Sequence, residues 1–330
     1  MPAPNNTFLS TSAVGNRQEL SDVVDITDTW EVPIYSWLNK GKCVSTNPTW
    51  EKDVIRAAGE NIKAEGSDYE FNATTPPVKV GNHTQIMSDS WIVSNTQEVV
   101  DNAGQYERTK QAKLNVGLAL KKDVELAIVT NNASVGGATR EFGGLPTWLE
   151  TNVSRGSGGT NGGYSSGTGL TVAAGAGTQR AMTKTLIDGV LQSGAASGAK
   201  LRDIFGSLYL KSVFVTIMSD SAVAPFRYSV TDGKNNTMIA NADYYEGPHG
   251  RVMFHPNPQM SLAAGVARNL FFLDKEKVEF LWLRKLANDP NLAKTGDNSK
   301  GVIIGEGTLK VVNERGLGVL ADLYGLTSGS

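Results

Sequence analysis

The sequence predicts an α+β fold, in which helices and strands follow one another without regular alternation. Residues 49–57 and 78–93 alternate between two faces, as strands do. Residues 105–132 instead carry apolar side chains at every fourth position, as a helix does. The later segments are mixed in order, which argues against a doubly wound sheet. With 330 residues and 40% apolar content, the chain can bury a sizeable core.

Charge and cysteine content exclude several classes of protein. Lys plus Arg number 31 and Asp plus Glu number 33, so the net charge is −2. Such a balance is unlike a nucleic-acid binder that works by neutralising phosphates. Cys43 is the only cysteine, which excludes an intrachain disulfide and a cysteine-rich zinc site. There is no apolar run near the roughly 20 residues of a membrane helix, and no signal-peptide pattern. We therefore expect a soluble protein of a reducing compartment.

The first 45 residues predict an irregular arm with three basic and five acidic residues. Its apolar pieces are too short to form a core, so we expect it to lie on another surface. Residues 49–57 and 78–93 then predict a long two-stranded ribbon with a polar tip, because glycines and prolines interrupt the sequence between them. A lone ribbon is marginal in water, and another copy of the chain could supply the surface that it needs.

Two helices are expected next. Residues 94–97, SNTQ, have the form of a capping box and predict a short helix that ends near Gly104. Residues 105–132 predict the strongest helix of the chain, about 28 residues and roughly 40 Å long. Its apolar face consists of Val116, Leu120, Val124 and Ile128, and its other faces carry Lys121, Lys122, Asp123 and Glu125.

The second half of the chain begins with a change in composition. Residues 156–169 are mostly Gly and Ser and predict a flexible surface loop. Residues 179–192 predict a helix, residues 208–218 a buried strand, residues 219–268 an irregular region, and residues 269–286 and 302–323 further strands.

Two glycine motifs resemble enzyme signatures but lack part of the flanking strands and helices that those signatures require. Residues 163–167, GYSSG, match the G-x-S-x-G of serine hydrolases, with Ser165 as the nucleophile. That motif needs a buried strand before the serine and a helix after it, whereas both flanks are rich in Gly and Ser. Residues 316–321, GLGVLA, resemble a dinucleotide-binding turn, but only nine residues follow them. We therefore interpret both as chance matches.

The three histidines do not predict a metal site. His83 is expected alone on a strand, and His249 and His255 in a proline-rich loop. Neither a cysteine nor a clear carboxylate stands at ligand spacing from them. Contacts at the surface or between subunits are the better interpretation. The sequence thus predicts neither catalytic residues, nor a cofactor, nor a metal.

Several tryptophans lie in segments that cannot form a core. Trp30 and Trp37 belong to the arm, and Trp50 and Trp91 flank the base of the ribbon. Because large aromatic side chains are enriched at interfaces, this placement favours burial against a partner. Ordinary packing within the chain is the alternative, and the sequence leaves it open.

Short motifs that together characterise one family are spread along essentially the whole chain. They are NRQELSD at 16–22, VGNHTQI at 80–86, NTQEVVD at 95–101, LKKDVE at 120–125, GGLP at 143–146, TNVSRG at 151–156, FLD at 272–274, LAKTGD at 292–297 and EGTLKVVNE at 306–314. The chain resembles the major capsid proteins of tailed bacteriophages, which have the Hong Kong 97 capsid fold. The resemblance lies in the order of these motifs and in the order of arm, ribbon, long helix and glycine-rich loop. Residues 28–34 depart from the family pattern, and residues 195–268 match it poorly, which indicates an insertion or a variant subunit contact.

The resemblance implies a division of the chain into four parts. These are an N-terminal arm at 1–45, an extended β-hairpin loop at 46–92, a peripheral domain with a spine helix at 93–141 and 279–330, and an axial domain at 142–278. It also implies self-assembly into hexamers and pentamers that form an icosahedral phage head around double-stranded DNA, without sequence-specific binding. Portal, scaffold and decoration proteins are candidate further partners. The implied location is the virion, after assembly in the host cytoplasm, with no enzymatic activity, cofactor or membrane.

We expect contacts between copies to involve the arm and the extended loop. The candidate interface residues are Arg17, Trp30, Trp37, Trp50, Lys63, Glu65 and Trp91. Residues 46–92 carry four basic and seven acidic residues, whereas residues 179–268 carry nine basic and six acidic ones. Opposite charges of this kind could orient neighbouring subunits. The alternatives are a serine hydrolase that uses Ser165 and a phage tail or adhesion module, although the chain has no internal repeat.

Overall fold

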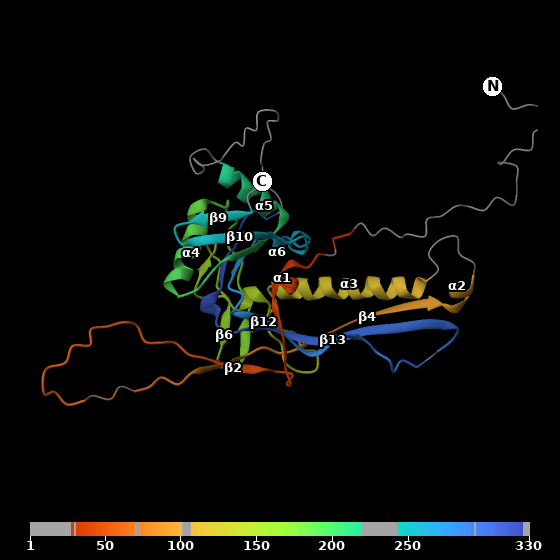
Figure 1. Cartoon of the computed structure of the whole chain (residues 1–330), viewed down its shortest axis with the longest axis horizontal. Helices are drawn as coiled ribbons and strands as arrows, with labels where there is room; N and C mark the ends of the chain where they lie inside the picture. The colour runs from red at the N-terminus through yellow and green to blue at the C-terminus, as the bar shows by residue number, and fades with distance from the viewer. Residues whose placement is uncertain are drawn as a thin grey trace, which may run out of the picture.

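The computed structural model describes residues 28, 29, 31–69, 71, 73–100, 107–219, 243–293 and 295–325. Its architecture is a mixture of helices and two main sheets, as expected for the α+β class (Figure 1). None of the helices in these ranges is long and apolar enough to cross a membrane.

A four-stranded sheet with the order β1-β12-β13-β4 forms one half of the structure. Its strands are β1 (Asn39–Lys42), β12 (Val278–Asn288), β13 (Asn298–Val311) and β4 (Gln85–Ser94). β1 runs parallel to β12, and the other pairs are antiparallel. The strands predicted in residues 269–286 and 302–323 are thus confirmed. Large apolar side chains such as Phe280, Leu309 and Phe142 fill the core beside this sheet.

The long helix is α3 (Arg108–Val129), which lies against β4 and β13 (Figure 1). Its 22 residues span about 33 Å, somewhat less than predicted from the sequence. Leu120, Val124 and Ile128 are buried as expected, but so is Glu125, which the sequence pattern placed on a solvent face. The prediction for Glu125 was wrong because groups from distant segments come to this carboxylate and satisfy it, as described below.

The short helix after the ribbon is α2 (Asn95–Val99). Ser94 occupies the N-cap position, as predicted, but its side chain makes no capping hydrogen bond. The Asn95 side chain instead donates a hydrogen bond of 2.6 Å to Asp297. This helix end is therefore held by the segment before β13.

The ribbon is much shorter than predicted. β2 (Thr49–Lys52) pairs in antiparallel register with β3 (Val78–Gly81), and the described residues between them, 53–69, 71 and 73–77, form no strand. The remainder of the second predicted strand, β4, pairs with β13 and not with β2. The periodicity identified strands correctly, but it could not identify their partners.

A second sheet of six strands has the order β5-β14-β11-β8-β10-β9. Its strands are β5 (Val153–Ser154), β14 (Gly318–Leu320), β11 (Leu270–Leu273), β8 (Asp203–Gly206), β10 (Gly250–Pro256) and β9 (Tyr244–Gly247). Helix α4 (Lys184–Ala196) confirms the helix predicted near 179–192, with Thr183 as its N-cap. β9 and β10 form one edge of this sheet. Both lie within residues 219–268, which were predicted to be irregular.

Residues 208–218 form a helix, α5 (Leu208–Ser219), and not the predicted buried strand. The Ser207 hydroxyl accepts a hydrogen bond from the Leu210 N–H and begins the helix. Leu210 and Phe214 then lie one turn apart in the second core, which is built around α4, α5 and the six-stranded sheet. A short run that is apolar on every side does not distinguish a strand from a buried helix.

The glycine-rich segment is also more structured than predicted. It contains β6 (Gly163–Ser165), which pairs with β7 (Leu170–Val172). At Gly156 an added Cβ would overlap the Thr178 carbonyl oxygen, and Gly162 is similarly close to Pro146. Glycine is needed at these two positions for close backbone packing, so its abundance in this segment has a structural reason.

Short elements complete the fold. They are α1 (Pro33–Trp37), η2 (Leu145–Thr147), η3 (Gln259–Ser261), α6 (Ala264–Ala267) and η4 (Glu314–Gly316). His83 lies between β3 and β4 and not on a strand, whereas His255 lies on β10 and not in a loop. The expected positions of these two histidines were therefore wrong, and only His249 lies in a turn as predicted.

Candidate assembly interface

The extended loop, residues 53–77, is the most exposed part of the described chain. It projects from the body beyond β2 and β3 as the orange trace in Figure 1. Ile55, Tyr69 and Phe71 are each more than 90% exposed, and Ile62 is 85% exposed. Lys63 and Glu65 are also exposed in this loop. A run of bare apolar side chains on a projecting loop is typical of an interaction surface.

The base of the loop is anchored in the chain's own core. Trp50 on β2 stacks on Trp148 with 5.7 Å between ring centroids. Its indole N–H donates a hydrogen bond of 2.9 Å to the Val311 carbonyl. Trp50 is therefore a structural anchor that packs, half-buried, against the core of its own chain.

The other tryptophans in the described ranges also pack within the chain. Trp37 on α1 contacts Phe205 edge to face, with 5.2 Å between centroids. Trp91 on β4 lies opposite Gly301 of β13, where an added Cβ would be 2.5 Å from the indole ring. Arg17 and Trp30 lie outside the described residues. Trp37 and Trp91 thus pack within the chain. An interface role for them, as for Trp30 and Trp50, stays a prediction.

The end of the arm is held by a buried carboxylate on α3. The Glu125 carboxylate accepts hydrogen bonds from the backbone N–H of Ile34 at 2.9 Å and of Tyr35 at 2.6 Å. The Asn257 side chain donates a third, at 2.6 Å. Burial raises the pKa of Glu125 to about 7, although these three hydrogen bonds act to lower it. One side chain thus joins the arm, α3 and the segment before η3.

Further contacts continue this attachment along the arm. The Gln259 side chain donates hydrogen bonds to the carbonyl oxygens of Thr29 and Glu31, at 2.5 and 3.2 Å. Lys122 of α3 forms an ion pair of 2.9 Å with Asp28. The arm from residue 28 onward is therefore fixed to its own subunit. Sequence reasoning missed Glu125 and Gln259, and the available signal was a carboxylate beside the apolar stripe of α3.

A second buried carboxylate, Glu306 on β13, lies near the base of the loop. It accepts a hydrogen bond of 2.7 Å from Thr84 and forms ion pairs with Arg140 at 2.8 Å and Arg284 at 3.1 Å. Burial alone would raise the pKa of this carboxyl, but the hydrogen bonds from Thr84 and the two arginines outweigh it and leave the pKa lowered. This cluster ties β13 to the segments on both sides of it.

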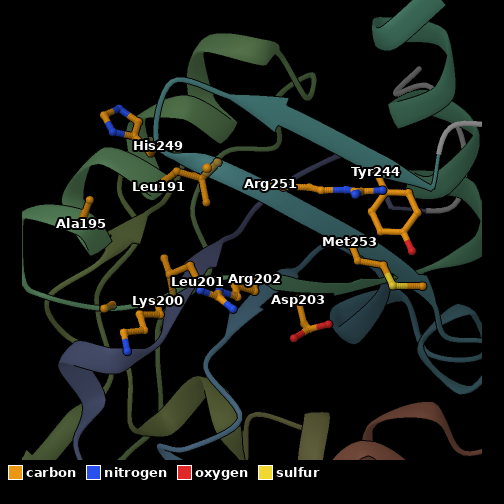
Figure 2. A pocket seen from close by; sticks show the side chains of 12 residues that line it. Leu191, Ala195, Lys200, Leu201, Arg202, Asp203, Tyr244, His249, Arg251 and Met253 are labelled. Carbon is orange, nitrogen blue, oxygen red and sulfur yellow. The ribbon is translucent and has the colours of Figure 1, made fainter.

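A groove in the second half of the structure has a cationic rim but no catalytic arrangement. It encloses about 590 Å³ between α4, β8 and the β9–β10 hairpin (Figure 2). Arg251 extends toward Tyr244 and stacks over its ring at 3.8 Å. The Asp203 carboxylate is engaged by His255 at 2.8 Å. This groove contains neither a nucleophile with an adjacent base nor a set of metal ligands.

The possible hydrolase nucleophile lies in an unsuitable place. Ser165 ends β6, and the next element is the β7 strand and not a helix. Among the described residues no hydrogen bond joins Ser165 to any of the three histidines. No group of three or more potential metal ligands occurs in those residues either. The geometry that nucleophilic catalysis requires is therefore missing around Ser165.

Comparison with known protein families identifies the family of this chain. Residues 4–324 match the family described as SU10 major capsid protein. The chain belongs to this family. No curated protein sequence matches it.

Solved capsid structures resemble this family member over nearly its whole length. The cyanophage A-1(L) capsid subunit has a TM-score of 0.61 at 12% identity, over 96% of this chain and 98% of that one. The capsid of a native GTA particle gives 0.62 at 12% identity, with the same coverage of 96% and 98%. The SrpI encapsulin of Synechococcus elongatus PCC 7942 gives 0.54 at 11%, over 96% and 95%. At these identities the likeness establishes the fold.

The SU10-type capsid protein therefore has the Hong Kong 97-like fold that its motif order indicated. Its family role is structural, as a major capsid protein that forms the virion shell. In this context the projecting loop and the attached arm are candidate surfaces for contact between subunits.

Proposed function

We propose that this protein assembles into hexamers and pentamers that close an icosahedral phage head around double-stranded DNA. The observation that carries the proposal is the extended loop, which displays Ile55, Ile62 and Phe71 to solvent. Exposing such side chains is unfavourable, and burial against a neighbouring subunit would remove them from water. Membership of a capsid protein family supplies the context.

In this proposal the loop reaches across to a neighbouring subunit while its base stays anchored by Trp50. Lys63 and Glu65 would contact the neighbour, because both are exposed on the loop. The division into arm 1–45, loop 46–92, peripheral domain 93–141 with 279–330, and axial domain 142–278 remains part of the proposal. Interface roles for Arg17 and Trp30 are also part of the proposal.

The proposed role is structural and not enzymatic. A net charge of −2 suits a wall that encloses DNA without gripping its phosphates. Assembly would take place in the host cytoplasm, with portal, scaffold and decoration proteins as candidate partners. No step in it requires a cofactor.

Electron microscopy of the purified full-length protein tests the proposal. We expect uniform closed shells or ring-shaped capsomers. A matched variant replaces residues 55–75 with a short Gly-Ser turn and keeps β2 and β3. It should unfold at a similar temperature but form no shells. Unmodified protein that remains monomeric at high concentration would contradict the proposal.

A further inference from the structure

A cavity lined by lysines lies where the arm, α3 and the edge of the four-stranded sheet meet. It encloses about 790 Å³. Tyr35 contributes aromatic surface to it, Trp282 lines its floor although it is only 4% exposed, and its charged lining consists of Lys40, Lys42, Lys121 and Lys285. We call these six residues the lysine pocket.

The chain brings the four lysines together from three elements. Lys40 and Lys42 lie on the edge strand β1, in register with Phe280 and Trp282 of β12. Lys121 comes from α3, and Lys285 lies beyond a bulge in β12. The Lys40 ammonium lies 4.6 Å from the centre of the Tyr35 ring. The pocket therefore gathers four cationic side chains beside the Tyr35 ring.

The charge of this pocket is not neutralised within the described part of the chain. Other lysines of the same region have carboxylate partners, such as Lys122 with Asp28 and Lys310 with Glu279. The four pocket lysines form no ion pair with a described residue, and no acidic side chain lines the cavity. Four like charges around one cavity repel one another, so an anionic partner would stabilise them.

A complementary surface exists on the extended loop of the same chain. Its tip, residues 60–69, carries the carboxylates of Glu60, Glu65 and Asp68 and one lysine. Ile62 and Tyr69, at 85% and 91% exposure, add apolar surface beside these charges. The tip thus combines negative charge with apolar side chains, and the lysine pocket combines positive charge with aromatic surface.

We infer that the lysine pocket of one subunit receives the loop tip of a second copy of this chain. The inference rests on the proposed function, because it names the place where the loop binds. Opposite charges would set the register and speed the encounter, and burial of Ile62 and Tyr69 against Tyr35 and Leu286 would supply affinity. Nucleic acid would satisfy the lysines too, but phosphates alone make no use of the aromatic surface.

Paired charge reversals test this docking in the full-length protein. The pocket variant is K40E/K121E/K285E, and the tip variant is E60K/E65K/D68K. Each alone should reduce the yield of closed shells by about tenfold or more, because like charges then face each other. The combined variant, which carries all six reversals in one chain, should recover assembly in hexamers and pentamers alike, because each reversed pocket then meets a reversed tip. K113E, at an exposed lysine elsewhere on α3, is the matched control and should assemble normally.

Separate controls test whether each variant folds and whether assembly depends on nucleic acid. Circular dichroism and thermal unfolding of each variant check that its fold is intact. If the pocket variant unfolds, K40Q/K121Q/K285Q removes the charge without adding a new one, and its shell yield should still fall. Assembly should proceed unchanged in the presence of nuclease.

Several results would overturn the inference. Normal shell yield from the folded pocket variant contradicts the docking alone and leaves the proposed function standing. Loss of yield that is not rescued in the folded combined variant also contradicts it, as do normal shells that have lost only bound nucleic acid. Failure of the unmodified protein to assemble contradicts the proposed function, and the inference with it.

Discussion

Glu125 on α3 accepts a 2.6 Å hydrogen bond from the backbone N–H of Tyr35, 90 residues earlier in the chain. The same carboxylate accepts hydrogen bonds from Ile34 and Asn257. Its burial is possible because each of these donors replaces a lost hydrogen bond to water. One acidic side chain therefore joins the arm and the long helix to a third segment of the chain.

Substitution of Glu125 should loosen the arm in a graded way. Ile34 and Asn257 donate to Oε1, and only Tyr35 donates to Oε2. At pH 5, below the Glu125 pKa of about 7, Glu125→Gln can keep its oxygen at the first position and lose one bond, which should lower the free energy of unfolding by about 1 kcal/mol. Glu125→Ala loses all three bonds and should cost about 3 kcal/mol or more. Urea denaturation measures both, with the exposed Glu246→Gln as the control; equal costs for the two Glu125 variants would contradict the scheme.

The raised pKa of Glu125 predicts a specific pH dependence. The folded carboxyl has a pKa of about 7 against its ordinary 4.5, so between these values the folded state binds more protons than the unfolded state. Stability from this group is fully present below pH 4.5 and is lost as the pH rises through 7, by up to about 3 kcal/mol. Denaturation of wild type and Glu125→Gln at pH 5 and pH 8 isolates this contribution. The variant should lack this fall, and identical pH profiles would show that Glu125 is not responsible.

The cluster around Glu306 should respond unequally to loss of its two arginines. The Arg140 side chain is 21% exposed and the Arg284 side chain 53% exposed, while that of Glu306 is only 4% exposed. Solvent screens the Arg284 pair more strongly, so Arg284→Ala should cost below about 1 kcal/mol. Arg140→Ala should cost about 3 kcal/mol, because it leaves a buried carboxylate poorly paired. Thermal and chemical unfolding compare the two, and a larger cost for Arg284→Ala would contradict this ranking.

Two glycines should respond in opposite directions to alanine. Gly117 lies within α3, and an added Cβ would make only an ordinary contact of 3.8 Å with Ile303. Gly117→Ala should therefore raise the free energy of unfolding by about 0.5–1 kcal/mol through helix propensity. At Gly144 the same Cβ would overlap the Thr130 carbonyl oxygen. Gly144→Ala should destabilise by about 2 kcal/mol. Differential scanning calorimetry gives both signs, and tolerance of alanine at position 144 would argue against the close approach.

The double reversal K63E/E65K changes the charge pattern of the extended loop without changing its net charge. Both positions are exposed, so the free energy of unfolding should change by less than about 0.5 kcal/mol. The number or size distribution of shells should change if these residues face a neighbouring subunit. Electron microscopy and light scattering measure the outcome. Equal yields of correctly sized shells would remove Lys63 and Glu65 from the interface.

Local periodicity was sufficient to predict helix or strand wherever only one face of an element packs against the core. The long helix followed from Leu120, Val124 and Ile128, and the last strands from alternating or apolar runs. It was insufficient for α5, where apolar side chains occur all around the segment. Ser207 just before that run, and the spacing of Leu210 and Phe214, were the available signals for a helix.

The sequence by itself determined the α+β class, the long helix, the projecting loop and the order of motifs that marks the capsid family. These depend on short-range patterns, which a chain carries without its fold. Only the tertiary structure decided that β4 pairs with β13, that Glu125 is buried, and that four lysines share one pocket. Each of these joins residues that are far apart in sequence, so no local pattern could reveal it.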